Sequence, residues 1–131
     1  MTGSGATALA DTSLFIAIEQ GRPLRSTPPA NLKVSWITVA ELKAGVLEAD
    51  TPTVTFVREL TLRRVEDLIP LPVDRVVAQA WAELRATMRE IKRRLSGNDM
   101  LIAATAIAHG LPVASQDDDF ADIPGLRLIQ L

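Results

Sequence analysis

Short apolar runs alternate along this chain with longer segments in which apolar residues recur every three or four positions. The short runs are typical of buried strands, which we expect at residues 8–10, 34–37, 68–71, 111–115 and 126–129. The periodic segments predict helices at residues 14–20, 38–48, 51–64, 73–95 and 99–109. Strands that alternate with helices in this way predict one α/β domain with a mostly parallel, twisted sheet and helices on both faces.

Two of the predicted helices differ in the width of their apolar face. The segment 73–95 carries one apolar stripe at helical spacing, which predicts a long amphipathic helix. Residues 99–109 are apolar nearly all round and end before Gly110, so we expect this helix to be buried. At the start of the chain, residues 1–7 (MTGSGAT) predict a flexible arm, which leaves residues 8–131 as a single domain.

The composition removes several kinds of chemistry. The 131 residues include no cysteine, which excludes disulfides, thiolate catalysis, Fe–S clusters and cysteine zinc sites. Because His109 is the only histidine, a site built from several imidazoles is excluded too. Carboxylates, hydroxyls and guanidinium groups remain, and they favour acid-based chemistry with a hard cation if the chain is an enzyme.

The net charge of −2 hides an uneven distribution. Residues 58–94 contain nine Lys and Arg against six Asp and Glu, whereas residues 99–131 contain one against five. This division predicts a cationic surface beside an acidic cluster. No apolar run approaches the roughly 18 residues of a membrane span, and no basic leader is present, so we expect a cytoplasmic protein without membrane contact.

Acidic residues follow the predicted strands at positions where ligand sites form in parallel sheets. Asp11 comes directly after the first strand, and Glu41 lies one helical turn after the second. Residues 117–119, all aspartates, follow the strand at 111–115, and Asp99 lies in the first turn of the buried helix. Because the carboxyl ends of parallel strands meet at one edge, we expect these segments to converge. Clustered carboxylates raise one another's pKa unless a cation is present, and an all-oxygen site suits Mg²⁺ or Mn²⁺.

Each of these acids also has an ordinary structural interpretation. Asp11 is placed to cap the helix that follows it, and Glu41 fits a capping box with Thr38. Asp99 suits the positive end of a helix dipole, and the aspartates at 117–119 suit a solvated turn. Only the shared placement of the four segments favours a site over these interpretations.

Three basic residues fall on one stripe of the predicted helix 73–95. Arg85, Arg89 and Lys92 are spaced by four and three residues. One interpretation is a solvated face with cations suited to the end of a helix, which Arg93 and Arg94 extend. The other is a ridge that contacts phosphates and guides a polyanion toward the acidic cluster. For both tryptophans of the chain we expect packing rather than base stacking.

Four short motifs carry a resemblance to a known family. They are ADTS at 10–13, TVAEL at 38–42 with Gly45, NDMLIAATA at 98–106 and HGLPVASQDDDF at 109–120. In order and spacing they resemble the motifs of PIN-domain ribonucleases, and within that family the VapC-type toxins of bacterial type II toxin–antitoxin pairs. The resemblance covers essentially the whole chain.

The resemblance implies a PIN-like three-layer α/β/α fold and a Mg²⁺-dependent endoribonuclease, with Mn²⁺ as an alternative metal, that leaves 5′-phosphate and 3′-hydroxyl ends. The implied catalytic and metal-binding acids are Asp11, Glu41, Asp99 and Asp117, with Asp11 and Asp99 as the direct ligands. Asp119 is the alternative to Asp117, and Thr12 and Ser115 match positions that support the site. For such a nuclease, the stripe of Arg85, Arg89 and Lys92 described above is the predicted RNA contact. Ser115-Gln116 departs from the Thr-Arg common in the family.

The resemblance also implies partners. Family members act as toxins, form homodimers and are inhibited by a small antitoxin whose C-terminal segment blocks the acidic site. We therefore expect an RNA substrate, a cognate antitoxin and a homodimer.

Two other functions fit parts of the pattern. A non-catalytic binding module would use the acidic pocket to hold basic side chains of a partner, and would show no metal affinity. A phosphoacceptor receiver-like domain matches the length and the acidic strand ends, but it needs two acids after the first strand and a lysine after a late strand. The lysines of this chain are Lys33, Lys43 and Lys92, none of which follows a late strand.

Overall fold

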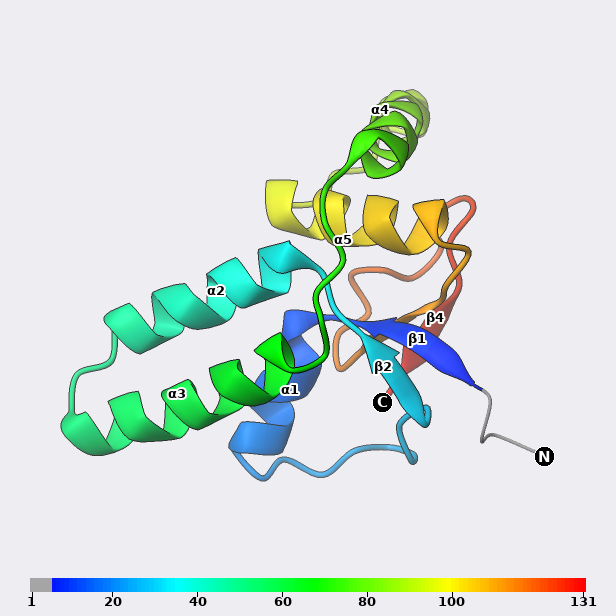
Figure 1. Ribbon diagram of the computed structural model, residues 1–131. Coiled ribbons are helices and arrows are strands. Elements are labelled where there is room, and N and C mark those ends of the chain that lie inside the picture. The colour runs from blue at the N-terminus through cyan, green and yellow to red at the C-terminus, as the bar shows by residue number, and fades with distance from the viewer. Residues whose placement is uncertain (1–5) are drawn as a thin grey trace.

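The centre of the fold is a sheet of four parallel strands, in a computed structural model that describes residues 6–131 (Figure 1). The strands are β1 (Thr7–Ala10), β2 (Asn31–Lys33), β3 (Val113–Ser115) and β4 (Leu128–Gln130), in the order β2-β1-β3-β4. Leu9 of β1 is opposite Lys33 on one side and Val113 on the other. The predicted parallel α/β domain is therefore confirmed.

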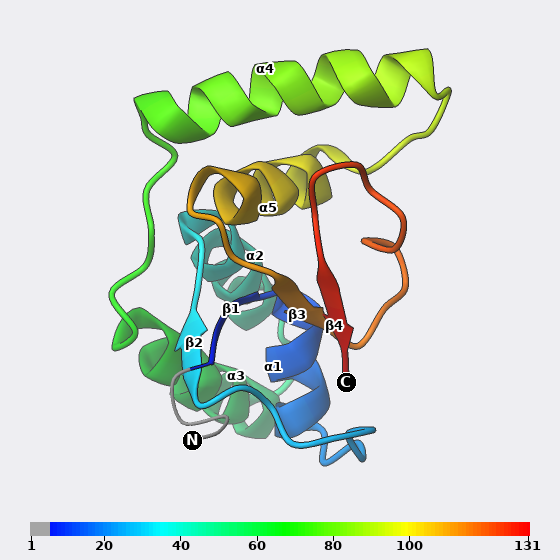
Figure 2. The ribbon, with the colours of Figure 1, turned by 90° about the vertical axis from the view of Figure 1, so that its right-hand side faces the viewer.

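Helices cover both faces of this sheet. Those in the described part of the chain are α1 (Thr12–Glu19), α2 (Trp36–Leu47), α3 (Pro52–Glu66), α4 (Arg75–Glu90) and α5 (Gly97–Ala108). Figure 2 shows α4 and α5 on one side of the strands and α1 and α3 on the other. The arrangement has three layers, with the sheet between two layers of helices, as expected.

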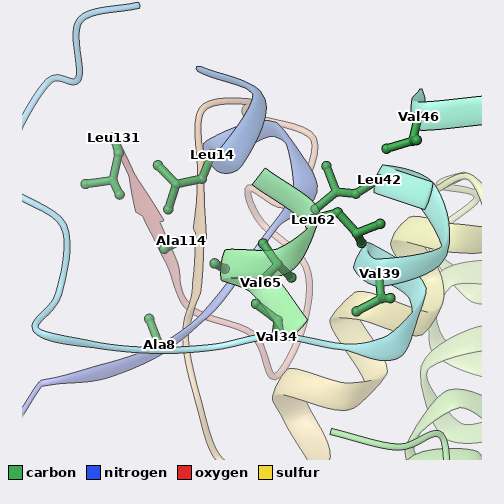
Figure 3. Packing of buried hydrophobic residues seen from close by; sticks show 11 residues of the cluster. Ala8, Leu14, Val34, Val39, Leu42, Val46, Leu62, Val65, Ala114 and Leu131 are labelled. Carbon is green, nitrogen blue, oxygen red and sulfur yellow. The ribbon is translucent and has the colours of Figure 1, made fainter. Parts of the chain in front are cut away.

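Alternation along the strands divides the core into two apolar clusters. Ala8 and Ala10 of β1 pack with Leu14, Leu42 and other residues of α1, α2 and α3 (Figure 3). Leu9 points the other way and packs against α4 and α5, together with Phe120. Successive side chains of a strand face opposite sides, so each face of the sheet is covered by its own helices.

The second strand and the helix after it begin earlier than the pattern predicts. Residues 34–37 were expected to be a strand, but β2 is Asn31–Lys33 and α2 begins at Trp36. Ser35 is the N-cap, and its hydroxyl accepts a hydrogen bond of 3.1 Å from the Ile37 N–H. A helix cap therefore overrides the strand propensity of the Val-Ser-Trp-Ile run.

The strand expected at 68–71 does not form. Ile69 has a left-handed backbone, with φ of 55°, which interrupts an extended chain. Leu71 alone pairs with the sheet, through an isolated parallel bridge to Ser35. The last two strands are also shorter than expected, at Val113–Ser115 and Leu128–Gln130.

The amphipathic helix ends about five residues before its predicted end. Lys92 has φ of 55°, and its N–H bonds the Arg89 carbonyl at 3.2 Å while the Arg93 N–H bonds the Met88 carbonyl at 3.0 Å. This pair of hydrogen bonds is a Schellman motif, which normally uses glycine at the left-handed position. Lys92 therefore lies beyond α4 and does not continue the stripe of Arg85 and Arg89.

Two further expectations concern the whole chain. The predicted arm at residues 1–7 falls mainly on residues 1–5, which lie outside the described residues, and Thr7 is already the first residue of β1. Within residues 6–131, no helix has the length and apolarity needed to cross a bilayer.

We expect Ile69→Gly to stabilise the protein. Ile69 is 82% exposed, so its removal loses little packing, and its φ of 55° is costly for a β-branched residue. The free energy of unfolding, measured by urea denaturation, should rise by about 0.5–1 kcal/mol. Val57→Gly within α3 is the control and should lower it by about 1 kcal/mol. A less stable Ile69→Gly variant would contradict the strain argument.

Candidate functional site

Asp11 is a buried carboxylate at the junction of β1 and α1. Only 4% of the residue is exposed. It occupies the N-cap position of α1, but its side chain makes no capping hydrogen bond. Its Oδ2 instead accepts hydrogen bonds from Ser13 Oγ at 2.8 Å and Ser115 Oγ at 2.9 Å. The helix-cap interpretation of this side chain is therefore wrong.

The two serines also tie the acidic loop after β3 to Asp11. Ser115 Oγ accepts a hydrogen bond of 3.0 Å from the Asp117 N–H. Ser13 Oγ accepts one of 3.2 Å from the Gln116 N–H and lies 3.1 Å from Ser115 Oγ. The loop that carries the candidate fourth acid is thus fixed to the same hydroxyl groups that orient Asp11.

Glu41 of α2 is held by side chains from two other helices. Thr12 of α1 donates a hydrogen bond of 2.6 Å to Glu41 Oε1, and Thr12 Oγ1 lies 3.0 Å from Thr38 Oγ1. Asn98 Nδ2 of α5 donates to Glu41 Oε2 at 3.4 Å. Both Thr38 and Glu41 lie inside α2, so the capping box predicted for them does not form. The prediction that Glu41 approaches the other acidic segments is supported by these contacts.

Asp99 lies in the first turn of α5, where Ser96 is the N-cap. The Asp99 N–H donates to Ser96 Oγ at 3.1 Å. Burial raises the pKa of Asp99 to about 6, and the negative charges of Asp11, Glu41 and Asp119 add to this effect, while the hydrogen bond with Ser96 opposes it. The carboxylate of Asp99 thus lies within the electrostatic field of the other candidate acids.

The acids after β3 belong to the same cluster. Burial raises the pKa of Asp117, and the charges of Asp11, Asp119 and Asp118 add to it, whereas the Arg22 guanidinium lowers it. Asp119 is exposed, yet its charge acts on both Asp99 and Asp117. Asp117 and Asp119 both remain candidates for the fourth acid.

The donor set fits a hard divalent cation. The convergent groups are carboxylates, and hard cations such as Mg²⁺ prefer oxygen ligands. Burial is the main cause of the raised pKa values of Asp99 and Asp117, and the charges of the neighbouring acids raise them further. Within residues 6–131, no three acidic or imidazole side chains are already close enough to enclose an ion. The carboxylates would therefore have to draw together around it.

A cavity of about 590 Å³ opens beside Asp99. It lies between the segment that joins α4 to α5 and the acidic loop, and Asp99, Asp118 and Asp119 contribute to its wall. Arg93 closes one side: Nη2 donates to the Asp119 carbonyl at 2.8 Å, and Nη1 donates to the Ala121 carbonyl. Arg93 was expected in the last turn of a helix, but it connects two loops instead.

Sequence reasoning missed four side chains that build the site. Ser13 and Asn98 stand inside the motifs quoted above and adjoin predicted acids, so the motifs themselves could have indicated them. Thr38 also stands inside a quoted motif, but the pattern there predicts a helix cap rather than a partner of Thr12. Arg93 carries no comparable signal, because its contacts cross from the α4–α5 segment to the acidic loop.

Of the predicted RNA contacts, two share a surface. Arg85 and Arg89 are exposed on α4 and line a cavity of about 530 Å³ with Trp81. The Arg85 guanidinium lies 5.3 Å from the centre of the Trp81 ring. Lys92 lines neither this cavity nor the acidic one.

A parallel α/β/α sandwich with carboxylates at one edge of its sheet is the architecture of PIN domains. The sequence model of the PIN domain matches residues 8–126, and the chain belongs to the PIN-domain family. Within it, the chain is 42% identical to ribonuclease VapC5 of Mycobacterium tuberculosis, over 100% of this chain and 98% of the relative. It is 39% identical to ribonuclease VapC4 of the same organism, over 95% and 96% of the two chains.

Comparison with solved structures supports the same family assignment. A member of the VapBC family of toxin–antitoxin systems, VapBC-5 from M. tuberculosis, has a chain with a TM-score of 0.87 and 39% identity, which covers 96% of this chain and 99% of that one. A chain of FitAcB from Neisseria gonorrhoeae has a TM-score of 0.75 and 27% identity, with coverage of 93% and 96%.

We expect Asp99→Asn to stabilise the metal-free protein at pH 8. Because folding raises the pKa of Asp99 from 3.8 to about 6, the fold favours its protonated form. The protonated carboxyl of Asp99 therefore contributes to the free energy of unfolding. This contribution is fully present below about pH 4 and is lost as the pH rises through about 6. In EDTA, the Tm of the variant should therefore exceed that of the parent at pH 8, and the difference should vanish near pH 4.

The control for this experiment is Asp50→Asn, in the exposed turn between α2 and α3. It should produce no comparable pH-dependent difference in Tm. Equal Tm values for Asp99→Asn and the parent at pH 8 would show that folding does not raise the pKa of Asp99.

Proposed function

We propose that this protein is a Mg²⁺-dependent endoribonuclease, able to use Mn²⁺, that acts as the toxin of a toxin–antitoxin pair. The observation that carries the proposal is the buried carboxylate of Asp11, which is oriented by two serines and surrounded by Glu41, Asp99 and the acidic loop. Full-length similarity to ribonucleases VapC5 and VapC4 supports RNA as the substrate.

The residues would divide the work as follows. Asp11 and Asp99 would bind the metal directly, and Glu41 and Asp117, or Asp119 in its place, would complete the acidic set. A divalent cation bound there would lower the pKa of a water molecule and neutralise charge on the scissile phosphate. Ser13 and Ser115 fix the orientation of Asp11, and Thr12 fixes that of Glu41. Precise placement of ligands by such hydrogen bonds is what outer groups contribute to a metal site.

Basic side chains outside the acidic set would hold the RNA substrate. Arg85, Arg89 and Lys92 are exposed, and Coulomb attraction draws a polyanion toward such groups. Phosphate contacts of this kind give affinity that falls with salt and carries little sequence information.

The partners would be an antitoxin and a second copy of the chain. The similar M. tuberculosis structure is a member of a toxin–antitoxin family, which supports a protein partner for this chain. An antitoxin segment with basic side chains would neutralise the acidic cluster and block RNA. The homodimer follows from the family resemblance.

We expect RNA cleavage to require the metal and the buried acids. Purified protein should cut structured RNA with Mg²⁺ and be inactive in EDTA, because the carboxylates position the ion rather than react themselves. Asp11→Asn and Asp99→Asn should each lower kcat/KM by about a hundredfold or more. Of Asp117→Asn and Asp119→Asn, the variant with the larger loss identifies the fourth acid. Cleavage that persists in EDTA or in both Asp11→Asn and Asp99→Asn would refute the proposal.

We expect Thr12→Val to lower kcat/KM by about tenfold while the protein stays folded, because it removes the hydroxyl that orients Glu41 and keeps the side-chain shape. Thr61→Val is a matched control, since Thr61 donates to Glu19 at 2.7 Å, away from the acids. Activity should be measured at saturating Mg²⁺ and Tm compared in parallel. Equal losses for the two variants would mean that the hydroxyl of Thr12 has no special role.

A further inference from the structure

The segment between α4 and α5 separates two cavities of opposite charge. On one side lies the cavity of about 590 Å³ with Asp99, Asp118 and Asp119. On the other lies a cavity of about 530 Å³, here named the basic groove, lined by Trp81, Arg85, Met88, Arg89, Arg93, Arg94, Leu95, Gly97 and Met100. Arg93, Arg94 and Leu95 line both, so the two cavities adjoin.

Arg93 forms the wall between them. Its two terminal nitrogens donate to the carbonyls of Asp119 and Ala121, so its side chain is committed to the protein. A guanidinium has five N–H donors in a fixed plane, and two of its nitrogens are already engaged here. Arg93 therefore holds the acidic loop in place and has few N–H donors left to bind a substrate.

The other arginines of the groove are free to bind a ligand. Arg89 and Arg94 are exposed, and within residues 6–131 no carboxylate pairs with either guanidinium. The guanidinium carbon of Arg85 lies over the Trp81 ring, 5.3 Å from the ring centre. Trp81 packs against the core cluster beneath α4, as expected, but it is only partly buried, so the groove combines unpaired planar cations with a partly exposed aromatic ring.

This combination is chemically selective. Guanidinium groups bind phosphate oxygens in bidentate fashion, and aromatic or arginine planes stack on unpaired bases. We infer that the basic groove binds the single-stranded RNA segment next to the scissile bond, with Arg89 and Arg94 on phosphates and the Trp81–Arg85 pair against a base. The inference rests on the proposed function and adds to it a defined path for the substrate.

Trp81 makes the groove directly observable. The chain has two tryptophans and no tyrosine, so Trp36→Phe leaves Trp81 as the single tryptophan reporter. The probe is a ten-nucleotide oligouridylate in EDTA, which prevents cleavage if the chain is the proposed metal-dependent nuclease. We expect saturable quenching of Trp81 fluorescence, with a dissociation constant that matches the one from fluorescence anisotropy of labelled oligouridylate.

Arginine variants then test the phosphate contacts. In the same background, Arg89→Ala with Arg94→Ala should weaken binding about tenfold, because two charged donors are lost. The slope of log affinity against log salt should fall by about 0.7 for each lost contact to a single strand. Arg63→Ala with Arg64→Ala, two exposed arginines on α3 across the sheet, is the charge-matched control and should change neither quantity. The single variants Arg89→Gln and Arg94→Gln should each produce about half of the slope change.

Several results would overturn the inference. One is constant Trp81 fluorescence at RNA concentrations where anisotropy shows saturated binding. Another is RNA binding by the arginine variants that is as tight as that of the control. Polyglutamate of equal charge could compete as well as RNA, which would make the groove a site for acidic protein segments. With Mg²⁺ present, unchanged KM for RNA cleavage in the double arginine variant would refute the groove but leave the nuclease intact. Binding in the groove without any cleavage by the parent would refute the nuclease alone.

Discussion

The carboxylate of Asp11 is buried at the end of β1, and this placement is possible only if hydrogen-bond donors meet it there. A buried ion without partners is costly, and two serine hydroxyls, from α1 and from the end of β3, supply the donors. Ser115 reaches Asp11 only because β3 lies directly beside β1 and runs parallel to it. The sheet order, the first turn of α1 and the loop after β3 are thus all constrained by one side chain.

Around this carboxylate the chain gathers further charge that opposes folding. Asp99 has its pKa raised to about 6, first by burial and then by its acidic neighbours. Its position in the first turn of α5 offsets part of the repulsion, because the positive end of a helix dipole favours an anion. The cluster is therefore better suited to hold a cation than to stabilise the empty fold, which is the usual compromise at a functional site.

The sequence predicted the sheet, the helices and the converging acids because these depend on local patterns and on the common geometry of parallel strands. It misplaced elements where a tertiary contact or an unusual backbone decided the outcome. Thr38 resembles a helix cap, yet it lies inside α2 and its hydroxyl meets Thr12. Lys92 ends α4 in a left-handed conformation that glycine normally adopts, so the periodicity continued past the real end of the helix. The partners of Arg93 are backbone carbonyls, which leave no trace in a sequence.

The early end of α4 has a consequence for how opposite charges coexist in this molecule. The turn at Lys92 sends Arg93 across to the acidic loop, where its guanidinium bonds the carbonyls of Asp119 and Ala121. Had the same guanidinium paired with the carboxylate of Asp119, it would have occupied oxygens that the proposed metal ion would need if Asp119 is the fourth acid. Because it holds the backbone instead, it fixes the loop and adds positive charge nearby while the carboxylate oxygens stay accessible. An acidic isoelectric point of about 5.4 is therefore compatible with a polyanionic substrate, since a bound cation would neutralise the acids and the unpaired arginines line the adjoining groove.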